Sequence, residues 1–200
     1  MGYFPAREFM LPTGQRLVIR NPVPEDAARL LDYAHVVLQE SEYFLLAPDE
    51  LTLSEEEEQD WIREHSEEDG SILLAAEVDG FLVGLLGFEN GPQRRVAHRG
   101  NLHLSVGQPW RGIGIGTILL QSVIDWATAH PTIEKVSLSV MVTNHRAIGL
   151  YRKFGFREEG RLSREIKLGP DRYEDELLMC RFVKPNSPVP TLPPRGSGAG

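Results

Sequence analysis

Apolar residues that alternate with polar ones, and short apolar runs, predict the strands of this chain. Seven stretches show one of these patterns, and we expect a strand in each: residues 15–20, 71–78, 81–88, 98–106, 135–142, 156–168 and 172–183. Asp79-Gly80 separates the second stretch from the third, and this pair predicts a tight hairpin. Residues 1–14 show no clear period, so we expect a loose lead-in there.

Apolar residues at spacings of three and four predict four helices. The first covers about residues 24–38, and the third follows a glycine-rich run and ends near Ala129. Ser54 and Glu57 form a capping-box sequence at the start of the second helix. Asn144 suits the cap position of the fourth. The buried stripe expected on the first helix consists of Leu30, Leu31, Ala34, Val37 and Leu38.

Composition indicates one folded domain over residues 15–183. The chain has 200 residues, of which 41% are hydrophobic and 25% charged, as is ordinary for a soluble globular protein. Residues 184–200 are rich in proline and glycine, which predicts a disordered tail. Cys180 is the single cysteine, so the sequence offers no disulfide framework and no metal-binding cysteine cluster.

Charge and hydropathy narrow the classes of partner. A net charge of −8 argues against a nucleic-acid partner, because such proteins usually present a basic face. No apolar run approaches the roughly 18 residues of a membrane span, and we expect no membrane partner and a cytoplasmic location. The six histidines show no H-x-x-x-H spacing, so we expect no metal.

A glycine-rich run joins the strand at 98–106 to the third helix. It reads Arg111-Gly-Ile-Gly-Ile-Gly-Thr117. Glycines at such a junction expose backbone N–H groups at a helix start, where the macrodipole also favours an anion, so a phosphate is the expected ligand. The run differs from a dinucleotide fingerprint, because Thr117 stands where the third glycine belongs, and from a Walker loop, because no lysine follows.

Two motifs together resemble the GNAT superfamily of acyl-CoA-dependent N-acetyltransferases. Residues 111–116 fit the R-x-x-G-x-G pattern of its pyrophosphate loop. Residues 144–156 match its N-x-x-A-x-x-x-Y-x-x-x-G-F segment at every named position. The resemblance extends over about residues 15–183, and its ribosomal-protein and small-amine branches are the most similar.

The resemblance implies an α/β (α+β) fold. Its central sheet would be mixed but mostly antiparallel, with about seven strands and about four flanking helices. The fourth and fifth strands of this sheet would splay apart. It also implies acetyl-CoA as co-substrate and direct attack of a primary amine on the thioester. Many members of the family are dimers, so a homodimer is an option that rests on analogy alone.

The resemblance also implies how acetyl-CoA would be held. The pantetheine arm would pair with backbone groups of Leu104, Ser105 and Val106 in the splay. Asn144 matches the asparagine that hydrogen-bonds this arm. The pyrophosphate would lie on the backbone amides of Arg111, Gly112, Ile113, Gly114, Ile115, Gly116 and Thr117.

Tyr151 falls on the family's tyrosine position and is the expected proton donor to the departing sulfur. A phenol has a pKa of about 10 and stays protonated at pH 7. The alternative is that Tyr151 is only a core aromatic residue, one helical turn after Ala147.

The general base is less defined. A lysine-like amine has a pKa of roughly 10.4, so neutralising it at pH 7 costs about 4.6 kcal/mol. The family often uses a carboxylate on the third or fourth strand, but no Asp or Glu occurs between Asn90 and Gln108. His103 is the first candidate, Glu89 the second and His98 the third, and water alone is the remaining option.

Several functions are consistent with these motifs. The acceptor could be a small amine, an amino acid, a polyamine, an aminoglycoside, or the N-terminus or a lysine of a protein. A non-catalytic acyl-CoA sensor with the same fold is the alternative from another class, and Tyr151 disfavours it because a sensor does not need a proton donor. Nothing in the sequence separates the acceptor classes.

Overall fold

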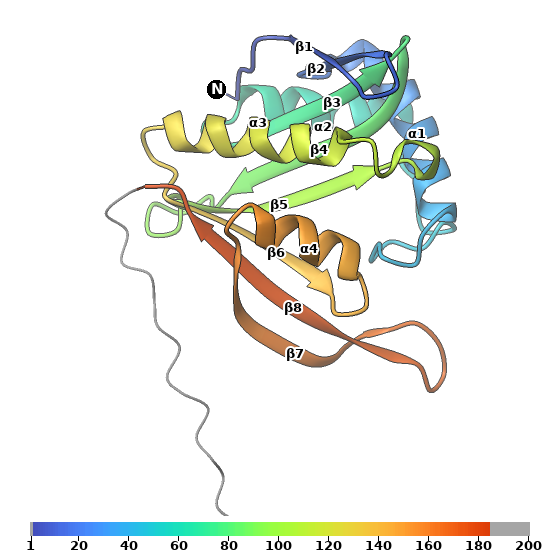
Figure 1. Ribbon diagram of the computed structural model, residues 1–200, viewed down its shortest axis with the longest axis vertical. Coiled ribbons are helices and arrows are strands. Elements are labelled where there is room, and N and C mark those ends of the chain that lie inside the picture. The colour runs from blue at the N-terminus through green and yellow to red at the C-terminus, as the bar shows by residue number, and fades with distance from the viewer. Residues whose placement is uncertain (1, 185–200) are drawn as a thin grey trace, which may run out of the picture.

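An eight-stranded sheet forms the centre of the structure, a computed structural model that describes residues 2–184 (Figure 1). The strands lie in the order β1-β2-β3-β4-β5-β6-β8-β7, and the β5–β6 pair is parallel while its neighbours are antiparallel. Their bounds are β1 Arg7–Met10, β2 Arg16–Arg20, β3 Ile72–Val78, β4 Phe81–Asn90, β5 Arg99–Val106, β6 Lys135–Met141, β7 Arg157–Lys167 and β8 Tyr173–Phe182. The mixed α/β GNAT fold expected from the sequence is confirmed.

Four α-helices cover the two faces of this sheet. They are α1 Ala27–Gln39, α2 Glu55–Glu67, α3 Ile115–Ala129 and α4 His145–Lys153, and short 3₁₀ turns cover Pro24–Asp26 and Gln108–Trp110. In Figure 1, α3 and α4 lie in front of the sheet and α1 and α2 behind it. Among the described residues, no helix is long and apolar enough to cross a bilayer.

The larger hydrophobic core lies between the sheet and the α3–α4 layer. Leu119, Leu120 and Val123 of α3 are fully buried there against Leu86 and Phe88 of β4. A smaller cluster on the opposite face joins α1 and α2 to β3 and β4. Both faces of the sheet are therefore covered at β3 and β4, which alternate between two apolar layers, whereas β7 stays mostly exposed.

The first strand corrects the prediction of a loose lead-in over residues 1–14. β1 pairs with β2 in antiparallel register, with Phe9 opposite Leu17, so the sheet has eight strands where about seven were expected. Phe4 and Leu11, on either side of β1, are buried in the main core. The strand itself is four residues long and mostly exposed, so its sequence does not show the alternation of apolar and polar residues that predicts a strand. Except for Lys184, the predicted tail lies outside the described residues.

The sheet opens between β5 and β6. Their parallel pairing covers Arg99–Asn101 against residues 135–137 and ends there. β5 continues to Val106 beside β4 alone, while β6 continues beside β8. This confirms the predicted splay, since β5 and β6 are the fourth and fifth of the strands expected from the sequence.

Two local predictions are confirmed by their hydrogen bonds and backbone angles. Ser54 Oγ accepts from the Glu57 N–H at 3.2 Å, and Glu57 Oε2 accepts from the Ser54 N–H at 2.8 Å, which is the reciprocal capping box. Asp79 and Gly80 both have positive φ, 52° and 83°, as the tight turn between β3 and β4 requires.

An ion network fixes the start of α1 to the sheet. The Arg20 guanidinium donates to both oxygens of Asp26, at 2.6 and 2.9 Å, and to Glu77 at 2.7 Å. Asp26 is only 4% exposed. Burial opposes ionisation of Asp26, but the hydrogen bonds from Arg20 and the Val23 N–H outweigh it and lower its pKa.

We expect Arg20→Ala to lower the free energy of unfolding by about 3 kcal/mol, because it leaves a buried carboxylate without its main partner. Urea denaturation at pH 7 measures this. Arg16→Ala is the matched control, because Arg16 also lies on β2 and pairs with a carboxylate, that of Glu8 on β1. Both side chains are more than 60% exposed, so the loss of unfolding free energy should stay below about 1 kcal/mol. Equal losses in the two variants would contradict a structural role for the buried network.

Candidate active site

A cavity of about 520 Å³ occupies the opening between β5 and β6. Its walls come from both faces of the sheet: Leu104 and Tyr151 belong to the α3–α4 side, while His103 and Glu89 belong to the other. A smaller cavity of about 330 Å³ lies between α1 and the β3–β4 turn and contains none of the predicted catalytic residues. The larger cavity therefore connects the two sides of the sheet at one point.

Strand register explains why polar residues gather on the α1–α2 side of this opening. Glu89 lies opposite Asn101 and shares its face of the sheet with His103 and Ser105, because every second residue of a strand points the same way. Glu176 of β8 lies opposite Met141 of β6. The parallel pairing of β5 with β6 carries the same face across the gap, so these polar groups all border the cavity from one side.

Of the predicted catalytic residues, Tyr151, His103 and Glu89 line the cavity and His98 does not. His98 precedes β5, and its carbonyl accepts from the N–H groups of Glu134 and Lys135 at 2.7 and 3.1 Å. Its place is therefore at the closed end of the β5–β6 pair, away from the opening.

The glycine-rich loop has the geometry of an anion site. Gly112 and Gly114 have φ of 90° and 103°, which L side chains rarely adopt. Ile118 donates the first backbone bond of α3, to the Gly114 carbonyl at 3.0 Å, so the N–H groups just before it have no intrahelical acceptor. These residues fit a pyrophosphate by backbone donors and helix dipole.

One donor of the predicted phosphate site already has a backbone partner. The Arg111 N–H already donates to the Gln108 carbonyl at 3.2 Å, and its side chain binds the Val106 carbonyl through Nε at 2.8 Å. Glu40 of the segment after α1 accepts from the Gln108 N–H at 2.7 Å and lies 3.7 Å from the Arg111 guanidinium. Arg111 thus shapes the loop by holding it to β5 and to α1.

Strand register distinguishes the three residues of β5 that are predicted to pair with the pantetheine arm. The Gly107 N–H bonds to the Val83 carbonyl, and hydrogen-bonded pairs alternate along an antiparallel ladder, so the backbone groups of Ser105 face β4. Those of Leu104 and Val106 face the opening. Because Arg111 occupies the Val106 carbonyl, Leu104 is the residue whose backbone best fits an extended ligand arm.

Helix α4 brings two predicted residues to the opening. Asn144 Oδ1 accepts from the Ala147 N–H at 3.2 Å, which confirms the predicted cap and leaves the amide NH₂ as the group that can donate to a ligand. Tyr151 is 7% exposed, and burial raises its pKa to about 12. Its hydroxyl is therefore protonated at neutral pH.

His65 of α2 holds Glu89, a contact that the sequence did not predict. His65 Nε2 lies 2.8 Å from Glu89 Oε1, and Nδ1 lies 2.8 Å from the Trp61 carbonyl. Both ring nitrogens face acceptors, so the ring is best satisfied as an imidazolium. Burial opposes that charge, but the two hydrogen bonds outweigh it and raise the pKa of His65. The same bond lowers the pKa of Glu89.

Tyr33 is a second residue that sequence reasoning missed. The expected stripe on α1 omitted it, yet Tyr33 is buried and lines the cavity. Its hydroxyl donates to Ser105 Oγ at 3.0 Å, and burial raises its pKa. The available signal was its position three residues after Leu30, on the buried face of the helix.

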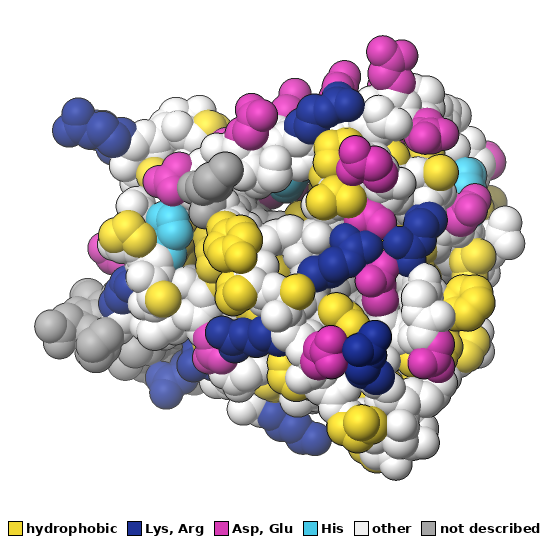
Figure 2. Space-filling view, turned by 90° about the horizontal axis from the view of Figure 1, so that it is seen from above, with side chains coloured by type: hydrophobic (Ala, Val, Ile, Leu, Met, Phe, Trp, Pro, Cys, Tyr) yellow, Lys and Arg dark blue, Asp and Glu magenta, His cyan; other side chains and the backbone are white. Residues whose placement is uncertain are grey.

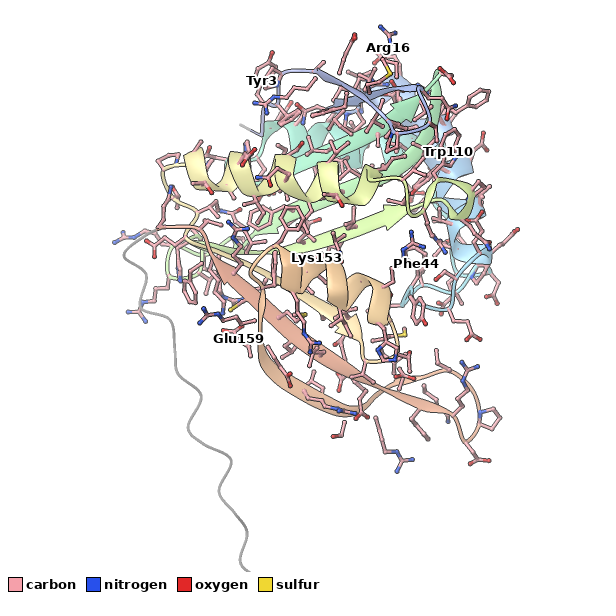
Figure 3. The ribbon with its side chains drawn as sticks, in the orientation of Figure 1. Tyr3, Arg16, Phe44, Trp110, Lys153 and Glu159 are labelled. Carbon is pink, nitrogen blue, oxygen red and sulfur yellow. The ribbon has the colours of Figure 1, made fainter. Side chains whose placement is uncertain are left out.

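The α1–α2 loop forms the outer wall of the cavity. Figure 3 shows Phe44 on this loop beside α4, and Phe44 lines the cavity. Two contacts hold the loop: Arg172 of the β7–β8 turn donates to both oxygens of Glu42, and Tyr43 donates to the Thr143 carbonyl at 3.4 Å. Segments far apart in sequence thus enclose the same space.

Surface charge and metal-ligand geometry add two further observations. On the face that Figure 2 shows, acidic and basic side chains are interspersed, with no broad basic field. Within residues 2–184, no group of three His, Cys, Asp or Glu side chains is placed to hold a metal ion. Cys180 is buried, and burial raises its pKa to about 11.

Comparison with known proteins agrees with this geometry. Residues 35–156 match the acetyltransferase (GNAT) family. An N-alpha-acetyltransferase of Sulfolobus acidocaldarius is 36% identical over 118 residues, which are 55% of this chain and 70% of that protein. An L-amino acid N-acetyltransferase of Escherichia coli is 27% identical over 121 residues, 60% of this chain and 74% of that protein.

A solved structure shares the whole fold. It is a putative acetyltransferase from Salmonella typhimurium with its cofactor acetyl-CoA, and it superposes with a TM-score of 0.75 at 17% identity over 88% of this chain and 99% of that one. The family match covers more than half of the chain and agrees with the splayed sheet and the glycine-rich loop, so the chain belongs to the GNAT family. It is an acetyl-CoA-dependent N-acetyltransferase.

We expect Gly114→Ala to destabilise the fold by about 1–2 kcal/mol, because its φ of 103° is costly for any residue with a Cβ. It should also weaken binding of coenzyme A, which calorimetry measures. Gly149→Ala is the control: nothing lies within 4 Å of the Cβ position at either glycine, but Gly149 lies inside α4. Alanine there should be neutral or stabilising by up to about 1 kcal/mol. Equal effects would contradict the role of loop conformation.

Proposed function

We propose that the cavity between β5 and β6 is where acetyl-CoA and a primary amine meet, with Tyr151 as proton donor and Glu89 as base. The observation that carries this is the connection through the sheet. One cavity reaches Leu104, Asn144 and Tyr151 on one side and Glu89 on the other. The donor and the acceptor can therefore approach the same point from opposite faces.

The donor site would consist mainly of backbone groups. The amides of residues 114–117 would hold the pyrophosphate, and the Leu104 backbone and the Asn144 amide would hold the pantetheine arm. When bound, acetyl-CoA supplies a thioester whose carbonyl carbon is the electrophile. The opening of the sheet supports this arrangement, because β5 past Asn101 has unpaired backbone groups on its β6 side.

Tyr151 would protonate the leaving sulfur. As the amine nitrogen bonds to the carbonyl carbon and the carbon–sulfur bond breaks, the electron pair of that bond goes to sulfur, and the phenol O–H donates to it. The proton that the amine loses balances the one that Tyr151 gives. The raised pKa of about 12 supports this role, since the hydroxyl stays protonated throughout the working pH range.

Glu89 would accept the proton of the amine, directly or through water. Its Oε1 is fixed by His65, while its side chain is 48% exposed and borders the cavity. His65 would act as a positioning residue that orients the carboxylate and keeps it ionised. His103, the first candidate from the sequence, lies on the same sheet face and becomes the second choice. The His65 contact supports Glu89 because a fixed carboxylate costs less ordering during reaction.

The acceptor in this proposal is a primary amine. The names of the two relatives indicate different acceptors, an α-amine and L-amino acids. Both are primary amines attached to a carbon that bears a carbonyl group, so the names support the reaction and do not separate these substrates.

We expect Tyr151→Phe to lower kcat by about 100-fold or more while the affinity for acetyl-CoA stays unchanged, because only the proton donor is removed. Release of free thiol measures turnover, and calorimetry measures binding. Tyr173→Phe, at the exposed first residue of β8 and outside the cavity lining, should leave both unchanged. Undiminished turnover in Tyr151→Phe would refute this role, and binding without turnover in the wild type would favour an acyl-CoA sensor.

We expect His65→Gln to move the acid limb of kcat/KM to higher pH. His65 lowers the pKa of Glu89, so the carboxylate is ionised above that lowered value, and without the imidazolium its pKa rises. The groups that face this pair are Glu58 and Glu68 of the α2 segment and His103 of β5. The pH profile of thiol release measures the shift.

His35→Gln is the control, because His35 is exposed on α1 and does not line the cavity. It should leave the pH profile in place. An unmoved acid limb in His65→Gln, with the protein folded, would limit His65 to a structural contact between α2 and β4.

A further inference from the structure

We propose that the acceptor is the α-amino group of a peptide chain that begins with a large apolar residue, and that free amino acids are poor substrates. This inference rests on the proposed function and narrows its acceptor to one chemical class. Three features of the cavity carry it: the sign of its charges, its apolar walls, and the weakness of its base.

The charged side chains that line the cavity are of one sign. Among the described residues, Glu89 and Glu176 are its carboxylates, His103 is its histidine, and no Lys or Arg lines it. A substrate ammonium is attracted by these carboxylates, whereas a substrate carboxylate meets like charge and no Lys or Arg of the lining. The cavity thus selects for an amine and against an acid.

The two carboxylates lie on the same face of the sheet but come from strands on opposite sides of the gap between β5 and β6. Glu89 projects from β4, and Glu176 projects from β8 beside Met141 of β6, on the same sheet face. In a free amino acid the carboxylate is attached to the same carbon as the amine, so it enters the cavity with the reacting nitrogen. In a peptide that carboxylate is a neutral amide. The like-charge penalty is then removed while the amine is unchanged.

The walls around these carboxylates are apolar. They are formed by Trp61 of α2, Leu73 and Leu85 of the sheet, and Phe44, Leu45, Leu46 and Leu51 of the α1–α2 loop. Leu45 is 72% exposed and Leu46 42%, so the loop presents two adjacent apolar side chains to solvent beside the cavity. A large apolar first side chain fits these walls, whereas a second ammonium that lay against them, away from both carboxylates, would be desolvated.

The base also suits an α-amine. About one in ten α-amino groups of a peptide is neutral at pH 7, compared with about one in 2,500 lysine-like amines. His65 lowers the pKa of Glu89, which makes Glu89 a weak base. A weak base is sufficient for a nitrogen that is already partly neutral, and poorly suited to one that is not.

Thiol release from acetyl-CoA by the purified full chain tests this directly. The acceptors are a C-terminally amidated peptide that begins with leucine, the same peptide beginning with glycine, leucine amide, free leucine, and spermidine. We expect kcat/KM for the leucine peptide to exceed that for free leucine by about 100-fold, because the like-charge contact is absent. It should exceed that for the glycine peptide by about 10-fold or more through lost apolar contact. Leucine amide should resemble the peptide.

Glu176→Lys tests the charge argument within the cavity. A cation there should pair with the substrate carboxylate and narrow the preference for the leucine peptide over free leucine by about 10-fold or more. Glu174→Lys is the matched control, with the same charge change on the same strand but outside the cavity lining, and should keep the preference. Glu176→Gln is a milder change that replaces the test if the lysine variant does not fold. It should raise KM for the peptide with little change in kcat.

The outcomes separate this inference from the proposed function. Turnover with free leucine or spermidine that equals or exceeds turnover with the leucine peptide would overturn the inference and leave the acetyltransferase intact. An unchanged preference in both Glu176 variants would overturn the charge argument. Acetyl-CoA binding without thiol release for any of the five acceptors would overturn the proposed function and the inference with it.

Discussion

The divergence of β5 and β6 after three residue pairs is the feature on which the rest of the site depends. A closed sheet would bury the backbone of residues 102–106 in hydrogen bonds and would separate α4 from α2 by an unbroken layer. Because the strands part, the Leu104 backbone is free to pair with a ligand, and Tyr151 on one face shares a cavity with Glu89 on the other. The chemistry needs that shared space, since donor and acceptor must meet while water is largely excluded.

The elements around the opening are held by long-range polar contacts. Arg111 ties the glycine-rich loop to the end of β5, and Glu40 ties it to the end of α1. Arg172 and Glu42 join the β7–β8 turn to the α1–α2 loop. His65 joins α2 to β4 through the carboxylate proposed as base. Each contact connects the cavity wall to a separate part of the chain, so the geometry of the site depends on the whole fold.

Local patterns in the sequence were sufficient for much of this structure. The glycine run, the Asn144 cap, the Ser54 capping box and the Asp79-Gly80 turn are encoded within a few residues, because each is fixed by the conformational preference or short-range hydrogen bonds of its own segment. They predicted the order of helices, seven of the eight strands, and the position of the glycine-rich loop. The family resemblance then supplied the splay and indicated Tyr151, which lines the cavity.

The remaining features come from contacts that no local pattern records. His65 and Glu89 are 24 residues apart, and Tyr33 and Ser105 are 72 apart. The direction of the Ser105 backbone groups toward β4 and the use of the Arg111 N–H within its own turn depend on ladder register and loop geometry.

The most direct test of the account is amide chemical-shift mapping by NMR during titration with coenzyme A. The account predicts the largest shifts at Leu104 and residues 114–117. Shifts concentrated at the smaller cavity around Phe81 and Val36, with residues 114–117 unmoved, would contradict it.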